Sequence, residues 1–544
     1  MRLCRLRLGR LVPIAGTAAA ALLALTACAP GAPSGASGSS GSSGGGANTT
    51  LNIATTTDID NYNPLIGDST TDFWINDLMY PALMSINANG SKVPAVATSW
   101  GYTTSTQGYF NIRTGMKWSD GVALTAADVA WELNAIIKYQ PPGVVTGFIG
   151  NLKSATATSP THVELTLSHP DSTLIPEIGF WMPIVPMHIW DKVGDIGKYV
   201  PSKDWVSAGP YKLVSAQRGQ SYTLDRVTPY PFAPGGKPTM AKVVFDVYPD
   251  VNTEILALRS GAVDVIANTL PPSQVSVLAK TSGITTQKVP GLGYTFLTYN
   301  VTHTPLNNVL VRQALAHAVN DATLRQVVLD GQGVTTGGVP IAPVLKQWVD
   351  PSLQEYSFDP AMSRKLLEQA GYKPNSSGQF PLSFNLVYSL QDPVSSAMVN
   401  LIRSEAAQAG ITINLKGLSR NTFLQAGVQG SFDIYASSFS IEDNPIIGME
   451  LAFEPKGANN YTFDNNPQLT TLLQNAAVAP TMAQQVSLVH QAAQLVQNQV
   501  YDNVLFMQDP VVAYRTGWTG WVVEPSQLLS IVNPQSLANV KYSG

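Results

Sequence analysis

The sequence predicts an α/β fold with more than one domain, and three observations point to it. The chain has 544 residues, which is too many for one ordinary domain. Short strand-like runs alternate with helical patterns from residue 51 onward. Long helical patterns occur near residues 310–319, 361–370, 395–409 and 484–499, and the first three have a strand-like run nearby. Alternation of this kind favours α/β layers over an all-α or all-β fold.

The amino-terminal part of this pattern contains a strand and two helices. We expect a strand over 51–54 and the end of a helix over 77–83. Thr125 is followed three residues later by Asp128, a spacing that resembles a capping box with Asp in place of the usual Glu. A second helix is therefore predicted to start after Thr125 and to run through Ile136.

The middle of the chain carries a strand, a helix and a second strand in close succession. The strands are predicted over 243–248 and 263–266, and the helix over 253–259 is expected to stop at Gly261. Glycine is common just past the last helical residue because it tolerates left-handed backbone. This succession is again typical of α/β layers.

Charge and cysteine usage exclude several functions. The 32 basic and 36 acidic residues give a net charge of −4, and no long run of one sign occurs. A nucleic-acid partner is therefore not expected. The two cysteines, Cys4 and Cys28, both lie close to the amino terminus. The folded body should therefore have no disulfide, no thiolate metal site and no cysteine nucleophile.

No catalytic constellation is recognisable in the sequence. It contains no HExxH, GxSxG or phosphate-binding-loop motif, and no two of its six histidines are spaced i, i+4. We therefore predict a protein that is not an enzyme, with no catalytic residue, no metal site and no cofactor. His188, beside Ile189 and Trp190, is interpreted as a packed structural side chain.

The amino terminus has the pattern of an export signal. Four arginines and no acidic residue accompany an apolar run over 11–25, which is short for a membrane span of about 20 residues. The run ends in Leu25-Thr26-Ala27-Cys28, which resembles a bacterial lipobox. This resemblance implies that residues 1–27 are a lipoprotein signal peptide and that Cys28 receives the lipid. The alternative is a plain secretory signal cut after Ala27.

Residues 28–48 are rich in Gly and Ser and lack large apolar side chains. Such a segment cannot offset the entropy cost of ordering. We expect it to form a flexible tether between the membrane anchor and the folded body.

A set of short motifs in the body of the chain is specific to one family. Residues 112–121 read Ile-Arg-Thr-Gly-Met-Lys-Trp-Ser-Asp-Gly, and 124–129 read Leu-Thr-Ala-Ala-Asp-Val. Asn63-Pro64, Gly209-Pro210-Tyr211 and the segment 257–264 (Ala-Leu-Arg-Ser-Gly-Ala-Val-Asp) stand in the same order as in that family. The chain resembles the dipeptide, oligopeptide and nickel class of extracellular solute-binding proteins, family 5, over about residues 51–530.

The resemblance implies a periplasmic-binding-protein type II fold, with two hinged α/β lobes and an extra domain inserted in lobe one. By analogy with the family, we expect the following division. Lobe one (domain I) comprises residues 49–90, 204–300 and 510–544, the inserted domain II comprises 91–203, and lobe two (domain III) comprises 301–509. The ligand would lie between the lobes, which close by hinge bending.

The resemblance also implies ligand-binding residues in lobe one. The loop after the Asn-Pro motif faces the ligand in the family, which here indicates Gly67, Asp68, Ser69 and Thr70. Phe148 is a weaker candidate that rests on approximate alignment. The signature residues Trp118 and Asp120, and Arg312 further along the chain, are interpreted as local folding determinants.

In lobe two, peptide binders of the family present an aromatic residue and then a carboxylate for the peptide amino group. The element follows Phe432-Asp433 here, and it is one residue shorter than the usual pattern. The carboxylate is Glu442 or Asp443, or is replaced by Ile441, depending on where the gap falls. The candidates in lobe two are Phe439, Ser440, Glu442, Asp443 and, from approximate alignment, Met507 and Gln508.

The function implied is that of the substrate-binding component of an ABC importer. It would capture a di- or oligopeptide and deliver it to the permease and ATPase subunits, as a monomer held on the outer face of the cell membrane by its lipid anchor. The alternatives are a binder of a non-peptide solute, such as a nickel chelate, haem or an oligosaccharide, and a surface lipoprotein that senses a ligand.

Overall fold

The computed structural model describes residues 49–67, 69–142, 144–203, 205–390, 392–439, 443–526 and 528–543. The predicted signal peptide, Cys28 and the tether lie outside the described residues, as do Asp68, Ser440 and Glu442. Strands and helices alternate along the body, so the predicted α/β class is confirmed. Within the described ranges, no helix combines the length and the apolarity needed to cross a membrane.

A seven-stranded mixed sheet forms around the first described strand. Strand β1 (Thr50–Thr55) pairs in parallel with β10 (Lys242–Val247) on one side and with β11 (Val265–Ile266) on the other. Antiparallel strands complete both edges: β9 (Ser221–Arg226) and β8 (Tyr211–Gln217) beyond β10, and β19 (Val511–Arg515) and β12 (Ile284–Lys288) beyond β11. The strands predicted over 51–54 and 243–248 are confirmed, whereas the one predicted over 263–266 is shorter.

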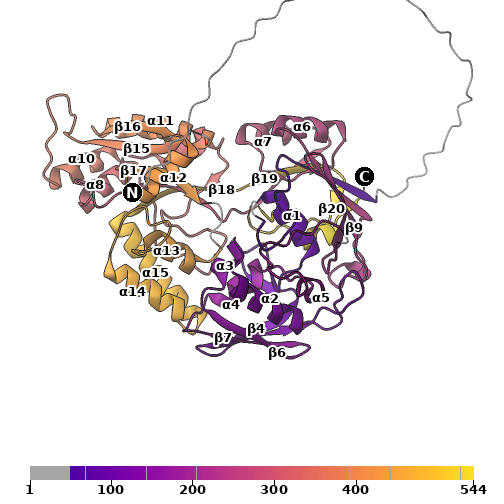
Figure 1. The fold of residues 1–544 in the computed structure, drawn as a ribbon. Helices are drawn as coiled ribbons and strands as arrows, with labels where there is room; N and C mark the ends of the chain where they lie inside the picture. Colours follow the sequence, from indigo (N-terminus) through magenta and orange to yellow (C-terminus); the bar gives the residue numbers. More distant parts are fainter. Residues whose placement is uncertain are drawn as a thin grey trace, which may run out of the picture. The chain divides into compact units, whose positions relative to one another are not determined.

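Helix α6 (Val251–Ser260) follows β10 and has clear signals at both ends. The side chain of Asp250 accepts hydrogen bonds from the backbone N–H groups of Asn252 and Thr253. Gly261 ends the helix with a φ of 80°, which confirms the predicted stop. Helix α6 and α7 (Pro272–Leu278) lie next to each other (Figure 1) and share one apolar cluster with this sheet.

A four-stranded antiparallel sheet lies within residues 97–167. Its order is β4 (Ala97–Thr104), β5 (Gln107–Ile112), β7 (His162–Leu167) and β6 (Leu152–Ser159). Helix α2 (Ala126–Tyr139) packs on it. The predicted capping box is confirmed, because the Thr125 side chain accepts from the first turn and the Asp128 carboxylate accepts from the Thr125 N–H at 2.8 Å.

A six-stranded sheet organises the later part of the chain. Its order is β14 (Gly333–Val334), β18 (Asp502–Gln508), β13 (Tyr294–Tyr299), β17 (Ile434–Phe439), β15 (Ser383–Ser389) and β16 (Thr412–Leu418). Strand β13 falls in the segment 204–300 that was predicted for lobe one. It nevertheless pairs with β17 and β18 along its length, so the chain enters the second sheet before residue 294.

The helices of this part include the four predicted from sequence, which are confirmed as α8 (Val309–His317), α10 (Pro360–Gln369), α11 (Pro393–Gln408) and α15 (Met482–Gln499). Helix α14 (Pro467–Val478) runs beside α15 (Figure 1).

The remaining helices of the described body are spread over its whole length. They are α1 (Thr70–Met79), α3 (Val144–Phe148), α4 (Leu174–Trp181), α5 (Met187–Trp190), α9 (Asp321–Val328), α12 (Arg420–Gln429), α13 (Pro445–Phe453) and α16 (Pro534–Asn539), with a 3-10 turn at Pro234–Gly236. A short hairpin of β2 (Met84–Ile86) and β3 (Lys92–Pro94) and an antiparallel pair of β20 (Trp518–Thr519) and β21 (Lys541–Tyr542) are the remaining strands.

The chain passes between the seven-stranded and six-stranded sheets at two adjacent places. One connection joins β12 to β13 and the other joins β18 to β19. Asp509 links them, since it pairs with Lys288 at 2.9 Å and accepts from the Gly291 N–H at 2.9 Å. A Cβ atom on Gly291 would lie only 2.5 Å from the Gln508 carbonyl oxygen, so the connections approach this closely because residue 291 is glycine.

The buried apolar side chains form separate cores on the two sides of these connections. One cluster contains residues of the seven-stranded and four-stranded sheets, including Leu51, Phe245 and Val163. Two others surround the six-stranded sheet, one including Leu386 and the other Val489. The body thus has two independently packed core regions, and the functional site must be sought where side chains of both meet.

Candidate functional site

A cavity of about 370 Å³ is lined by side chains from both core regions. The loop before α1 and α1 itself contribute one part of its wall, and α3 and α4 contribute another. The start of α13, which belongs to the other core region, contributes a third part. The lining residues include Gly67, Ser69, Phe73, Asp77, Phe148, Glu177, Phe180, Trp181, Asp443 and Asn444.

Aromatic rings form the apolar part of the wall. The Trp181 ring centroid lies 5.9 Å from that of Phe148, on which it stacks, 6.0 Å from that of Phe73 and 4.8 Å from that of Phe180. Ligand pockets are mostly apolar and aromatic, with a few polar groups that fix orientation. The ring cluster around Trp181 fits that description.

The polar part of the wall contains acidic groups, and one lysine lies behind it. The ammonium of Lys92, in β3, bonds the carboxylate of Asp443, just before α13. It also lies 3.5 Å from the centroid of the Phe180 ring, as a cation–π contact requires. Asn444 donates through Nδ2 to Glu177 Oε1 at 3.0 Å, so a second polar link joins α4 to the start of α13.

Burial changes the protonation behaviour of the carboxyl groups in this wall. Burial, and next the neighbouring charge of Asp443, raise the pKa of Glu177 to about 8. Burial alone raises the pKa of Asp77 to about 7. Both groups therefore change charge near neutral pH, a property that gathers at functional sites.

Some of the lobe-one residues predicted to bind ligand line the cavity, and others do not. Gly67, Ser69 and Phe148 line the cavity. The Ser69 hydroxyl also caps α1, where it accepts from the Asp72 N–H at 3.0 Å. Thr70 does not line this cavity; it faces a separate hollow beside Asn268.

Of the described lobe-two residues predicted to bind ligand, one lines the cavity and three do not. Asp443 lines the cavity, whereas Phe439, Met507 and Gln508 do not. Phe439 stacks on Phe296, with centroids 5.0 Å apart, and Met507 is 1% exposed within a core cluster. Phe439 and Gln508 line a separate small hollow of about 130 Å³. Both strands, β17 and β18, pair with β13, and Phe439 and Met507 pack against the same core cluster.

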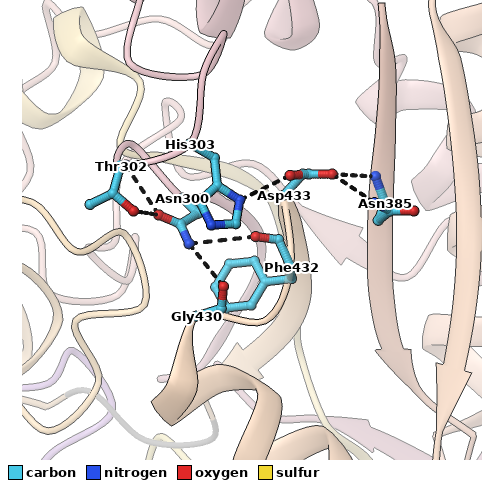
Figure 2. Close-up of polar contacts among 7 residues, drawn as sticks. All are labelled: Asn300, Thr302, His303, Asn385, Gly430, Phe432 and Asp433. Carbon is cyan, nitrogen blue, oxygen red and sulfur yellow. Dashed lines mark hydrogen bonds and ion pairs between the residues drawn. The ribbon is translucent and has the colours of Figure 1, made fainter.

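The Phe432-Asp433 pair, which served as the reference point for the lobe-two prediction, is structural (Figure 2). The Asp433 carboxylate accepts from the backbone N–H and side-chain Nδ2 of Asn385 at 2.8 and 3.0 Å, and lies 3.0 Å from His303 Nδ1. Asn300 donates through Nδ2 to the carbonyl oxygens of Gly430 and Phe432. These bonds hold the ends of β13, β15 and β17 together, and Asp433 does not line the cavity.

The residues interpreted as local folding determinants have that role. Trp118 donates through Nε1 to Asp128 in the capping box, and Arg312 donates to the carbonyl oxygens of Leu306 and Gln499. His188, interpreted as a packed structural side chain, also has a polar partner. Its Nε2 lies 2.7 Å from Asp120 Oδ2.

Several lining residues were not identified from the sequence, among them Asp77, Glu177 and Trp181. Lys92, which lies behind them, was not identified either. One local signal was available. Phe73 and Asp77 are spaced i, i+4 on α1, as Glu177 and Trp181 are on α4, and that spacing puts both side chains on one helix face. An isolated acid among apolar residues, as at Glu177, is a further sign of a special environment. Lys92 carried no such signal.

Across the part of the chain that the structure describes, no three or more His, Cys, Asp or Glu side chains gather as a metal site would require.

Comparison with a family model identifies the middle of the chain. Residues 92–460 match the model of bacterial extracellular solute-binding proteins, family 5. This match covers more than half of the sequence and includes β3, α4 and the start of α13, which carry Lys92, Glu177 and Asp443.

Comparison with individual known proteins also finds solute-binding proteins. The chain is 25% identical over 475 residues to the probable D,D-dipeptide-binding periplasmic protein of Escherichia coli, covering 85% of this chain and 89% of that protein. It is 25% identical over 371 residues to the nickel-binding periplasmic protein of the same species, covering 65% and 68%. The crystal structure of the ABC transporter substrate-binding protein CtaP of Listeria monocytogenes superposes with a TM-score of 0.81 at 19% identity, covering 92% of this chain and 100% of that one. The predicted two-lobe α/β fold is confirmed by this likeness.

Proposed function

The chain belongs to family 5 of the bacterial extracellular solute-binding proteins, and from this premise we propose that it captures a di- or oligopeptide outside the cytoplasm and delivers it to an ABC importer. The observation that carries the proposal is the cavity between α1, α4 and α13, because its wall joins two separately packed cores. A ligand in that cavity contacts both cores at once and can therefore stabilise the closed arrangement relative to an open one.

The two connections near Asp509 support a hinge mechanism. Hinges are a few residues between packed bodies that absorb backbone rotation. The connections 289–293 and 509–510 are short, adjacent and held together by the Asp509 side chain. Rotation there moves one core against the other without disturbing the packing inside either.

A peptide is the ligand class that the relatives favour, since one of those compared is a probable D,D-dipeptide-binding protein. A cavity of about 370 Å³ falls within the ~300–1,000 Å³ typical of small-molecule sites. The ring cluster around Trp181 would take apolar side chains. The polar groups of Ser69 and Asn444 would orient the peptide backbone.

One observation favours a second candidate ligand class. Asp443, a residue predicted to receive the peptide amino group, is already paired with Lys92. A ligand without a free amino group would leave that pair intact. A non-peptide solute is therefore the alternative, and a nickel-binding relative is one example of such a protein.

The remaining parts of the proposal concern location and partners. We place the body on the outer face of the cell membrane, tethered through a lipid on Cys28, on the strength of the lipobox-like Leu25-Thr26-Ala27-Cys28. The body acts as a monomer that docks on the permease of the importer. It releases its ligand chemically unchanged, so it is not an enzyme.

The test uses the full mature protein. Compounds that co-purify are released by mild denaturation and identified by mass spectrometry, and a panel of di- to pentapeptides and a nickel–histidine chelate are then titrated by calorimetry. We expect saturable binding of one peptide class at one site, with the peptide recovered intact. Binding of the chelate alone would favour the alternative, and recovery of a cleaved peptide would contradict the proposal.

A further inference from the structure

A second cavity, of about 380 Å³, adjoins the first. Both are lined by Phe73, Asp77, Ala82 and Phe180, so these residues form the boundary between them. The second cavity extends past β2 and β3 toward the carboxyl-terminal segment of the chain. The residues that characterise it are Asp77, Phe73, Phe180, Tyr230, Phe232 and Glu524.

Two carboxylates, that of the buried Glu524 and that of the half-buried Asp77, face this second cavity without a cation of their own. Glu524 is 2% exposed, and one of its oxygens accepts from the Ser85 hydroxyl at 3.2 Å. Among the described residues its other oxygen has no partner, and neither oxygen of Asp77 has one. Asp77 is half-buried, and it borders both cavities. Burying a carboxylate without a positive partner is costly.

The charges near these two groups are unbalanced. Asp77 and Lys92 are the charged groups that act on Glu524, the first raising its pKa and the second lowering it. Lys92, however, bonds Asp443 and acts on Glu177 as well. Three carboxyl groups, those of Glu177, Asp443 and Glu524, therefore share one lysine, and Asp77 adds a fourth carboxyl group next to Glu524. Burial is the main reason that the pKa of Glu524 is raised to about 8.

The other walls of the second cavity are aromatic, which also suits a cation. Phe73, Phe180, Tyr230 and Phe232 all line it. The face of Phe180 already holds a cation, since the Lys92 ammonium lies 3.5 Å from its centroid. Arg113 lies 5.0 Å from the Phe232 centroid and donates to the Ala95 carbonyl oxygen. Aromatic faces attract ammonium and guanidinium groups, most strongly where water is excluded.

We propose that the second cavity is a subsite for a cationic group of the ligand, a primary ammonium or guanidinium, bound by Asp77 and Glu524 within an aromatic enclosure. This inference rests on the proposed function and specifies it, because the transported solute is then a cationic one, such as a short peptide that contains lysine or arginine. The subsite is distinct from Asp443, whose carboxylate is held by Lys92.

The test compares two peptides that differ only in the charge of one side chain. A lysine-containing tripeptide and the same peptide with Nε-acetyl-lysine are titrated into the mature protein by calorimetry at pH 8.5 (about half a unit above the raised pKa of Glu524). The variant is Glu524→Gln. The matched control is Glu254→Gln, since Glu254 is also a buried carboxyl group whose pKa burial raises to about 8, but it lies on α6 and lines neither cavity.

We expect the lysine peptide to bind at least about tenfold more tightly than the acetylated one, as loss of a charge-assisted bond implies. Glu524→Gln should remove most of this preference, while Glu254→Gln should keep it. Circular dichroism and the melting temperature show whether each variant is folded. If Glu524→Gln does not fold, Asp77→Asn serves as the second variant.

The possible failures are distinguishable. Equal binding of the two peptides overturns the subsite and leaves peptide capture intact. Binding of neither peptide contradicts peptide capture. In that case agmatine and a linear diamine are titrated. If either amine binds and Glu524→Gln weakens its binding at least tenfold, the subsite is supported. If neither amine binds, or if Glu524→Gln leaves its affinity unchanged, the subsite is overturned.

Discussion

Lys92 and Asp443, 351 residues apart in the sequence, form an ion pair at the wall of the main cavity. Their side chains are 15% and 8% exposed, so water screens the pair little. Lys92 lies in the β2–β3 hairpin beside the first core region, and Asp443 precedes α13 in the other. The pair thus links the two halves of the proposed binding site when the cavity has its present shape.

Lys92→Met should destabilise the protein, because it leaves Asp443 and Glu177 close together with no cation. Breaking a buried pair by removing one partner costs about 3–5 kcal/mol, and we expect a fraction of that here, about 1–2 kcal/mol. The control is Lys242→Met, since Lys242 and Asp225 are about half exposed and such surface pairs contribute about 0–1 kcal/mol. Urea denaturation at pH 7.5 measures both variants. Equal destabilisation by the two substitutions would contradict the expectation.

Glu254→Gln should stabilise the protein more as the pH rises. Glu254 is fully buried, its carboxylate oxygens have no hydrogen-bond partner among the described residues, and burial raises its pKa to about 8. Between the ordinary pKa of about 4.5 and about 8, the folded state keeps a proton that the unfolded state has released. Stability from this group therefore falls as pH rises through that window. The melting temperatures of variant and parent should be closest at pH 4 and furthest apart at pH 8, and a constant difference would show that Glu254 is ionised in the folded state.

Gly291→Ala should strain the connection between the two sheets. The added Cβ would lie 2.5 Å from the Gln508 carbonyl oxygen and 3.2 Å from Met507 Cγ, so the two connections would have to separate. We expect a loss of about 1–3 kcal/mol in the free energy of unfolding, as for other overpacked sites. Gly147→Ala is the control, because nothing lies within 4 Å of the added Cβ there and alanine favours the α3 helix. Urea denaturation distinguishes the two, and a neutral Gly291→Ala would mean that the connections are free to move apart.

Phe148→Ala should weaken ligand binding while changing stability little. Its ring stacks on Trp181 and lines the cavity, so truncation removes contact area with any ligand that fills this end. We expect about a tenfold loss of affinity or more, a size common for aromatic contact residues. Tyr109→Ala is the control, since Tyr109 stacks on His162 away from both cavities. Calorimetric titration with the best peptide of the panel measures the effect, and equal affinities for both variants would exclude Phe148 from the site.

Cys28→Ser should release the protein from the membrane of the producing cell. If Cys28 carries the lipid anchor, the serine variant cannot be acylated and should appear in the soluble fraction outside the cytoplasm. Cys4→Ser is the control and should remain in the membrane fraction. Fractionation with immunoblotting, and the mass of the mature amino-terminal peptide, are the measurements. An unmodified mature terminus in the parent protein would indicate a plain secretory signal.

Features set by neighbours in the chain could be predicted from the residues alone. The Thr125–Asp128 capping box and the stop of α6 at Gly261 depend on hydrogen bonds and backbone angles within a few residues, and both were predicted. Trp118, in the motif at 112–121, was interpreted as a local folding determinant, and it bonds Asp128 ten residues later. Short-range physics was sufficient in each of these cases.

The lining of the candidate site could be predicted only in part. Of the ligand-binding residues that the family resemblance implies, Gly67, Ser69, Phe148 and Asp443 line the cavity, whereas Phe439 and Met507 pack into a core. Whether a strand residue faces a cavity or a core depends on the sheet in which the strand pairs, and that pairing joins segments far apart in the sequence. Lys92 could be recognised as part of the candidate site only from the fold, which places it against Asp443 and Phe180. Local patterns therefore determined the class of the fold and its helix ends. The meeting of distant segments decided which side chains share a cavity, because burial and charge act through space and not along the chain.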